Sequence, residues 1–426
     1  MNTERDTSYL HILEDELIPA LGCTEPTAVA LASAKACAVL GSFPSTLEVA
    51  CSGDIVKNVA GVLVPASGGH KGIRAAAILG ALGGDADREL QVLETVNDKD
   101  RARLAQLLAT NYCITQVIDD AANLLIRVTA HDNNGRQAFV EIKDSHTHFS
   151  RIEYDGEVLL DDAQETHAAR EEQSALTIAG ILEFARSVDT NEVRALLDRQ
   201  IEMNEAIARE GLRQDYGVRV GKTLIAEHTA DVARRARALA AAGSDARMSG
   251  CMLPVVINSG SGNQGLTASV PVCEYAREQG VTQERLYRAL IMSNLIAIHI
   301  KSHLGKLSAF CGVVCAACGS GAAITWLAGG DQAAIEHTIT NTLATIGGMF
   351  CDGAKPSCAA KIASSLDAAL LASELALTDQ NFQPGEGLVQ DDIEATIDAF
   401  GRLGRNAMHP ADEEIVRLMV KSSAIG

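Results

Sequence analysis

The segments that decide the fold class are ITQVIDDAANLLIRVTAHD (114–132), RQAFVEIKD (136–144) and THFSRIEYDGEVLL (147–160). Their apolar and β-branched residues alternate with polar ones, and turn signals such as NNG and YDG separate them. Alternation with a period of two is typical of strands with one buried face, and short Gly-containing turns join antiparallel neighbours. We therefore expect residues 90–170 to form an inserted α+β subdomain, built as an antiparallel sheet with one or two helices.

Helical patterns lie on both sides of this subdomain. Residues 8–20 and 26–41 repeat apolar positions at helical spacing, and Pro26 and Gly41 suit the first turn and the end of the second helix. Residues 46–65 resemble extended segments around a Gly-Asp turn. The first segment of the chain therefore mixes helices with extended structure.

From residue 171 onward, Ala-rich segments alternate with Gly, Ser and Asn loops. Aromatic residues make up only 4% of the chain, which favours close-packed helices over an aromatic-rich sandwich. The predicted fold is thus α+β, with a large all-α domain over residues 171–426. Residues 1–89 are expected to be the N-terminal part of the same functional unit as that domain.

Composition excludes several classes of function. The net charge of −19 argues against a nucleic-acid partner, because such proteins present a basic surface to phosphates. No apolar run is long enough to predict a membrane span, and the charged start MNTERDTSYLHILEDELIPA does not resemble a secretory signal. We therefore expect a cytoplasmic protein with no membrane partner; the sequence leaves a homo-oligomer open.

Eleven cysteines are informative in a reducing compartment, where they do not form a disulfide framework. Most such cysteines are small buried residues. The strongest candidates for chemistry are Cys311, in KLSAFCGVVCAACGSG, and Cys351 and Cys358, in GGMFCDGAKPSC. Spacing alone leaves metal or cluster binding and plain burial about equally favoured. Cys315 and Cys318 form a CxxC pair, so structural zinc is a competing interpretation.

A second candidate motif is GCTEPTA at 22–28. Cys23 precedes a predicted helix, where the helix dipole favours a thiolate. Glu25 is a candidate general base or a partner for a substrate ammonium group. The structural alternative is that Glu25 only complements the N-terminus of the helix.

Two glycine-rich loops are candidates for binding a carboxylate through backbone N–H groups. One is NSGSGNQG at 258–265, and the other is SGGHKG at 67–72. Lys306, just before the cysteine segment, is a candidate acid–base group. The residues of these loops that we predict to bind substrate are Ser67, Gly68, Gly69, Asn258, Ser261, Asn263 and Gln264.

The motifs GCTEP, SGDIVKN with VPASGG, NSGSGNQG, FCG and GGMFCDGAKPSC follow one another over nearly the whole chain. In this order they resemble the L-cysteine desulfidase family, which is related to the catalytic α-chain of iron–sulfur L-serine dehydratases. The resemblance implies a [4Fe-4S] cluster and no pyridoxal phosphate. It assigns the cluster ligands to Cys311, Cys351 and Cys358, and it makes Cys23 either a further ligand or a catalytic thiol.

The same resemblance implies β-elimination of L-cysteine to sulfide, pyruvate and ammonia. Cys23, Glu25 and Lys306 are then the candidate bases, and the two glycine loops hold the substrate carboxylate. Cys315 and Cys318 do not match the motifs and return to the buried-core interpretation.

Three alternatives stay open at the level of sequence. The first is dehydration of L-serine at the same cluster, in which hydroxide replaces sulfide as the leaving group. The second is a pyridoxal-phosphate lyase with Lys222 or Lys301 as the Schiff-base residue. The third is a non-catalytic sensor that kept the fold and lost the cluster.

Overall fold

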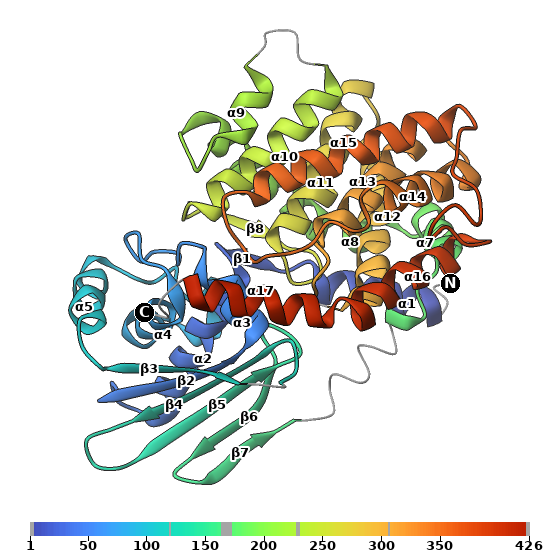
Figure 1. Cartoon of the computed structure of the whole chain (residues 1–426). Coiled ribbons are helices and arrows are strands. Elements are labelled where there is room, and N and C mark those ends of the chain that lie inside the picture. The colour runs from blue at the N-terminus through green and yellow to red at the C-terminus, as the bar shows by residue number, and fades with distance from the viewer. Residues whose placement is uncertain (1–3, 119–120, 163–172, 227–230, 306, 423–426) are drawn as a thin grey trace.

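The computed structural model describes residues 4–118, 121–162, 173–226, 231–305 and 307–422. It consists of a sheet covered by helices and a larger, almost entirely helical part (Figure 1). The predicted α+β class, with a large helical portion, is therefore confirmed.

One sheet of six strands has the order β3-β2-β4-β5-β6-β7. All its neighbours are antiparallel except β2 and β3, which are parallel. Its strands are β2 (Thr46–Ser52), β3 (Cys113–Ile118), β4 (Leu125–His131), β5 (Gln137–Lys143), β6 (Phe149–Tyr154) and β7 (Glu157–Asp161). The strands after residue 90 therefore share their sheet with a strand from the first segment of the chain.

Two helices of the first segment cover this sheet, α2 (Thr24–Leu40) and α4 (Gly72–Gly83). They pack closely, since a Cβ atom on Gly80 would lie 2.2 Å from the carbonyl oxygen of Ala30. Gly41 ends α2 in the left-handed conformation with φ 72°, as expected of a C-terminal glycine. The smaller helices of this part are α3 (Gly53–Ala60), η1 (Ala86–Gln91) and α5 (Asp98–Leu108).

The interpretation of residues 46–65 as extended throughout is wrong for α3. Ile55, Val56 and Val59 recur at helical spacing, and all three are buried on one face. Helical periodicity therefore outweighs the β-branched composition of this segment.

The helical part contains α1 and all the described helices after residue 173. Three of them, α11, α12 and α13, pack together at its centre, and their close contacts rely on small residues. The helices are α1 (Glu4–Glu16), α7 (Ile178–Ser187), α8 (Thr190–Arg213), α9 (Val220–Ile225), α10 (Val232–Met248), α11 (Gly262–Gln279), α12 (Gln283–Leu304), α13 (Val313–Leu327), α14 (Gln332–Ile346), α15 (Cys358–Leu377), α16 (Ile393–Arg402), η2 (Leu403–Ala407) and α17 (His409–Ser422).

A two-stranded antiparallel sheet joins the two parts of the molecule. It pairs β1 (Pro19–Leu21) with β8 (Pro254–Val256). Cys23 follows β1 by two residues, and the NSGSGNQG loop follows β8. This pairing therefore brings two of the candidate motifs together.

The last described helix, α17, returns to the first segment and packs on α3. In Figure 1 it crosses the molecule between the sheet layer and the helical part. Lys57 of α3, only 1% exposed, forms ion pairs with Asp54 at 2.6 Å and with Asp412 of α17 at 2.5 Å. The helix is thus held to α3 by a buried charge.

No helix in the described ranges combines the length and the apolar character that crossing a membrane requires.

Candidate active site

Cys311 and Cys351 are brought together by a short antiparallel pairing. Phe310 and Phe350 form an isolated bridge, in which the N–H of Cys311 donates to the carbonyl of Met349 at 2.8 Å and the N–H of Cys351 donates to that of Ala309 at 2.6 Å. Forty residues separate the two cysteines in the chain, and this bridge brings them side by side.

Cys358 begins α15, and its thiol lies 3.7 Å from the carbonyl oxygen of Gly353 in the preceding loop. Its side chain also packs against a small buried cluster of Cys23, Val62 and Met248. Cys23 of the first segment therefore lies beside Cys358 of the second half.

The pair of thiols Cys311 and Cys351 lies among positive charges. The S–H of Cys311 points to Cys351 and lowers the pKa of the Cys351 thiol to about 5, against the effect of burial and with help from the charges of Lys57 and Lys361. The same contact and burial raise the pKa of Cys311. Lys301 is also close enough to act on this pair. The pair therefore favours a single negative charge, surrounded by lysines.

Lys301 is buried, and its Nζ donates to the Ser308 hydroxyl at 3.1 Å. Burial lowers the pKa of this amine. Lys222, the other lysine considered for a Schiff base, forms an ion pair with Asp215 at 2.5 Å.

Cys23, Glu25 and His146 form a buried chain of polar groups. The Cys23 thiol donates to Oε2 of Glu25 at 2.9 Å, and Nε2 of His146 lies 3.8 Å from Oε1 of the same carboxylate. Burial raises the pKa of Glu25, but His146 and the Cys23 thiol outweigh it and lower this pKa to about 2.

The surroundings of Cys23 disfavour the thiolate that its position before a helix predicted. Burial, followed by the charge of Glu25, raises the pKa of the Cys23 thiol well above its usual value. The dipole of α2 does not overcome these two effects. The thiol therefore stays protonated and donates a hydrogen bond to Glu25.

The NSGSGNQG loop contacts residues next to both groups of cysteines. The Thr24 hydroxyl donates to the carbonyl of Gly260 at 2.8 Å, and a Cβ atom on Gly260 would lie 2.9 Å from Cε1 of His146. At its other end, Gln264 lies against Gly312, where an added Cβ atom would be 2.6 Å from the side chain of Gln264. The loop therefore connects the Cys23 side of the site with the Cys311 side.

The predicted substrate-binding residues of this loop have different surroundings. Asn258 is fully buried, donates to Asn294 and accepts from Ser259, which is a structural role. Ser261 precedes α11, and its side chain makes no capping hydrogen bond. Oε1 of the buried Gln264 has no hydrogen-bond partner among the described residues. Asn263 accepts a hydrogen bond from Arg247 at 3.2 Å.

The second glycine loop turns back on itself. The Ser67 hydroxyl donates to the carbonyl of His70 at 3.0 Å and accepts from the N–H of His70 at 2.9 Å. Gly68 and Gly69 are exposed and adopt positive φ angles. The hydroxyl of Ser67 is thus engaged within its own turn. Lys306, the third candidate base, lies outside the described residues.

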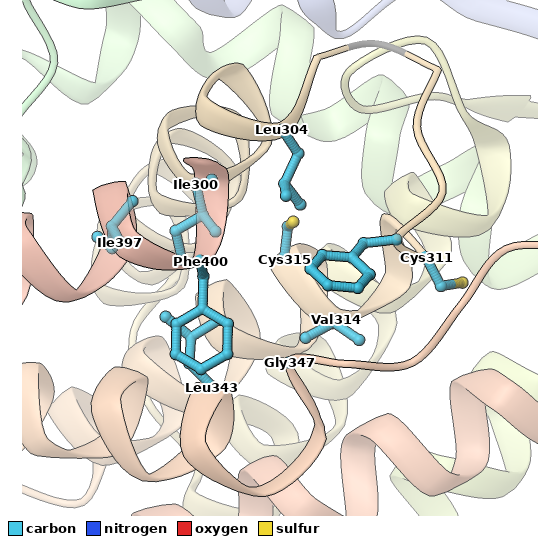
Figure 2. Close-up of a pocket in the computed structure, with 11 residues that line it drawn as sticks. Ile300, Leu304, Cys311, Val314, Cys315, Leu343, Gly347, Ile397 and Phe400 are labelled. Atoms are coloured by element: carbon cyan, nitrogen blue, oxygen red, sulfur yellow. The ribbon is translucent and has the colours of Figure 1, made fainter. Parts of the chain in front are cut away.

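Cys315 and Cys318 are fully buried residues of helix α13 and belong to the core of the helical part. Figure 2 shows the small apolar pocket lined by Cys311, Cys315, Leu304 and Phe400. The sulfur of Cys315 points toward Leu304, whereas the sulfur of Cys311 points away from the pocket. Cys311 therefore presents its thiol to the opposite side, which is the side of Cys351.

The chemistry of this donor set fits an iron–sulfur cluster. Among the described residues, no three His, Cys, Asp or Glu side chains gather closely enough to hold one metal ion. A cluster makes a different demand, because each thiolate binds a separate iron. Cys311, Cys351 and Cys358 supply three neighbouring thiols, and Lys57 and Lys361 supply positive charge for an anionic group.

Sequence reasoning missed Arg247, His146 and Lys57. The sequence does offer a signal for Arg247, which is a charged residue in an Ala-rich helix. That helix directly precedes β8 and the NSGSGNQG loop. Lys57 stands within the SGDIVKN motif. His146 lies in a polar turn between strands, where the sequence offers no such signal.

Comparison with known proteins identifies similar chains. The family model described as serine dehydratase alpha chain matches residues 87–417. A UPF0597 protein of Lachnoclostridium phytofermentans is 50% identical over 414 residues, which cover 96% of this chain and 99% of the relative. The UPF0597 protein DSY1109 of Desulfitobacterium hafniense is 45% identical over 415 residues, 97% of this chain and 96% of the relative. A UPF0597 protein of Finegoldia magna is 44% identical over 415 residues, 97% and 99% of the two chains.

Proposed function

This chain belongs to the serine dehydratase alpha chain family, and on that premise we propose that it is an iron–sulfur lyase that eliminates sulfide from L-cysteine. The products are aminoacrylate, which hydrolyses to pyruvate and ammonia, and sulfide. The observation that carries the proposal is the meeting of four cysteine thiols from distant segments: Cys311 beside Cys351, and Cys358 beside Cys23.

Cys311, Cys351 and Cys358 are the residues that would hold a [4Fe-4S] cluster. When bound, such a cluster supplies a Lewis-acidic iron that withdraws charge from the leaving group. The lysines around these thiols offset the negative charge of the site, since Lys57 and Lys361 both act on Cys351.

Cys23 and Glu25 are the residues that move the substrate's Cα proton. The thiol of Cys23 already donates to Oε2 of Glu25. As the Cα proton moves to Sγ of Cys23, the thiol proton passes to Oε2 of Glu25, so no free thiolate forms at this buried position. His146 faces the other carboxylate oxygen and keeps Glu25 ionised before the substrate arrives.

The second candidate function is dehydration of L-serine, and the description of the matching family model favours it. The two reactions differ only in the leaving group, so the same residues serve both. The ordered motifs around Cys23 and Cys351 favour L-cysteine.

The test is a comparison of the two substrates under anaerobic conditions. We expect the reconstituted protein to contain about four irons per chain and to release pyruvate and sulfide from L-cysteine with a higher kcat/KM than pyruvate from L-serine. Turnover of L-serine alone would establish the second candidate. Absence of both reactions in iron-loaded protein would contradict the proposal.

A further inference from the structure

Arg247 is a buried cation that forms no ion pair with any of the described residues. It lies near the end of α10, only 2% of its surface is exposed, and Nη1 donates to Oδ1 of Asn263 at 3.2 Å. Nε and Nη2 have no hydrogen-bond partner among the residues that the structure describes. A buried charge is costly unless it is paired, so these two nitrogens are suited to hold an anion that is not part of the described chain.

The guanidinium group lies at the N-terminus of α11. A Cβ atom on Gly262, the first residue of that helix, would lie 2.3 Å from Nε of Arg247. Only glycine therefore lets the guanidinium approach the first turn. The residue preceding the helix, Ser261, provides no side-chain cap, so the first N–H groups of an 18-residue helix remain available as donors.

Two independent features thus point to one anion site. One is the free Nε and Nη2 edge of a buried arginine, and the other is an uncapped helix N-terminus beside it. A planar carboxylate matches both, because its two oxygens accept parallel hydrogen bonds from a guanidinium edge.

We propose that Arg247 and the first turn of α11 bind the α-carboxylate of the substrate amino acid. This assignment rests on the proposed function, and it makes Arg247 the residue that selects α-amino acids over simple amines. The charge of Arg247 also acts on the Cys23 thiol. Met248, the residue after Arg247, packs against Cys23, so a carboxylate held here places the adjoining Cα on the Cys23 side of the site.

The competing role for Arg247 is to balance the charge of the cluster. That role requires no substrate and predicts loss of iron when the arginine is removed. Carboxylate binding instead predicts loss of ligand affinity at unchanged iron content, so the two roles give different results.

The test measures equilibrium binding by anaerobic calorimetry on the reconstituted protein. The probes are L-alanine, which has the carboxylate and the ammonium group but no leaving group, propionate, which lacks the ammonium group, and ethylamine, which lacks the carboxylate. We expect L-alanine to bind, propionate to bind more weakly and ethylamine not to bind. Because L-alanine is not turned over, failure of the proposed reaction would be seen separately.

The variants are Arg247→Gln, Arg247→Lys and Gly262→Ala, with Arg237→Gln as the matched control. Arg237 is on the same helix but pairs with Asp367. We expect Arg247→Gln to weaken L-alanine binding about 10- to 150-fold, the range for lost hydrogen bonds to a charged group. Arg247→Lys should restore part of the affinity, and Arg237→Gln should leave it unchanged.

Gly262→Ala keeps the positive charge but displaces the guanidinium, so it should also weaken binding, and it tests the site if Arg247→Gln does not fold. Folded Arg247→Gln or Gly262→Ala protein with unchanged affinity for L-alanine would overturn the proposal. The same holds if the unsubstituted protein does not bind L-alanine, or if Arg247→Gln loses iron while keeping its affinity.

Discussion

Cys23 is a buried cysteine and Cys351 a partly buried one, and their neighbours give the two thiols opposite roles in hydrogen bonding. Cys23 donates its S–H to the carboxylate of Glu25, whereas Cys351 receives the S–H of Cys311 and faces Lys57 and Lys361. A donor that is held by a carboxylate suits proton transfer. An acceptor among cations suits the binding of a metal cluster.

This difference predicts how single substitutions separate iron content from turnover. Cys311→Ser, Cys351→Ser and Cys358→Ser should each lower the iron and sulfide content after anaerobic reconstitution, because each removes a thiolate ligand. Cys23→Ser should keep the iron and lower kcat about 100-fold or more, as expected for the loss of a general base.

Cys318→Ala is the matched control for these variants, since Cys318 is a fully buried cysteine of the core. It should keep both iron and activity. Full iron content and activity in Cys311→Ser would rule out the assigned ligand, and loss of iron in Cys23→Ser would make Cys23 a fourth ligand.

The cysteines of the site were predictable from the sequence, because they stand in short motifs and thiolates are the usual ligands of iron–sulfur clusters. Arg247 and His146 could not be predicted in this way. Arg247 matters because two of its nitrogens have no hydrogen-bond partner among the described residues, and His146 matters because it lies beside Glu25. The free edge of Arg247 and its approach to Gly262 exist only after α10 and α11 have packed. Likewise, His146 lies beside Gly260 because the sheet layer packs against the helical part, and the sequence alone does not show this packing.

At the scale of elements, a half-buried ion pair fixes α16 in the helical part. Nε2 of His299 on α12 lies 2.7 Å from Oε2 of Glu394, and Oε1 of Glu394 accepts the N–H of Ile178 at the start of α7 at 2.6 Å. One carboxylate thus holds three helices together.

This contact predicts a dependence of stability on pH. Burial raises the pKa of Glu394, but the hydrogen bond and charge of His299 outweigh it, so the pKa is lowered from 4.5. A lowered pKa in the folded state stabilises the fold above about pH 4.5, and this stabilisation is lost as the pH falls through the folded-state pKa. Because 38% of the Glu394 side chain is exposed, solvent limits the effect to about 1 kcal/mol.

The measurement is urea unfolding of Glu394→Gln and unsubstituted protein between pH 7 and pH 4. Their difference in free energy of unfolding should shrink below about pH 4.5. Glu284→Gln, which removes an exposed carboxylate from α12, is the control and should show no such trend. A difference for Glu394→Gln that stays constant down to pH 4 would contradict the prediction.

Helices and strands were predictable where neighbouring residues in the chain carry the signal. Gly41 ends α2 as expected, and the alternating segments around residues 114–160 form strands. The pairing of β2 with β3 was not predictable. These strands are parallel and are joined through α3, α4 and α5, so no turn signal marks them as neighbours. The domain boundaries at residues 89 and 170 stay a prediction, although β2 shows that the first two segments share one sheet.

At the scale of the whole molecule, the candidate site lies where the sheet layer and the helical part meet. Cys23, Glu25 and His146 come from the sheet layer. The residues from the helical part are Arg247, Cys311, Cys351 and Cys358. Helix α17 joins the two at Lys57, which also acts on Cys351.

Asp412→Asn should therefore weaken the attachment of α17. Lys57 keeps its pair with Asp54, and the amide oxygen of an asparagine can still accept its hydrogen bond, but the negative charge of the acceptor is lost, which costs about 1 kcal/mol. Urea unfolding should show this loss, and limited proteolysis should cut near α17 faster. Glu414→Gln removes a carboxylate of the same helix that pairs at the surface with Arg417, and it should leave both measurements unchanged. Equal stability of the two variants would show that the ion pair does not hold α17.

The Lys57–Asp412 contact also bears on how the protein acquires its structure. It joins residues 355 positions apart, whereas the helices of the second half pack mainly on near neighbours in the chain. Contacts between distant residues form late in folding, because a long loop must close first. We therefore expect the cysteines of the site to stay open to solvent during refolding until the sheet layer and the helical part have packed together. Refolding in air should accordingly give a helical protein with oxidised thiols that no longer accepts iron, whereas anaerobic refolding should not.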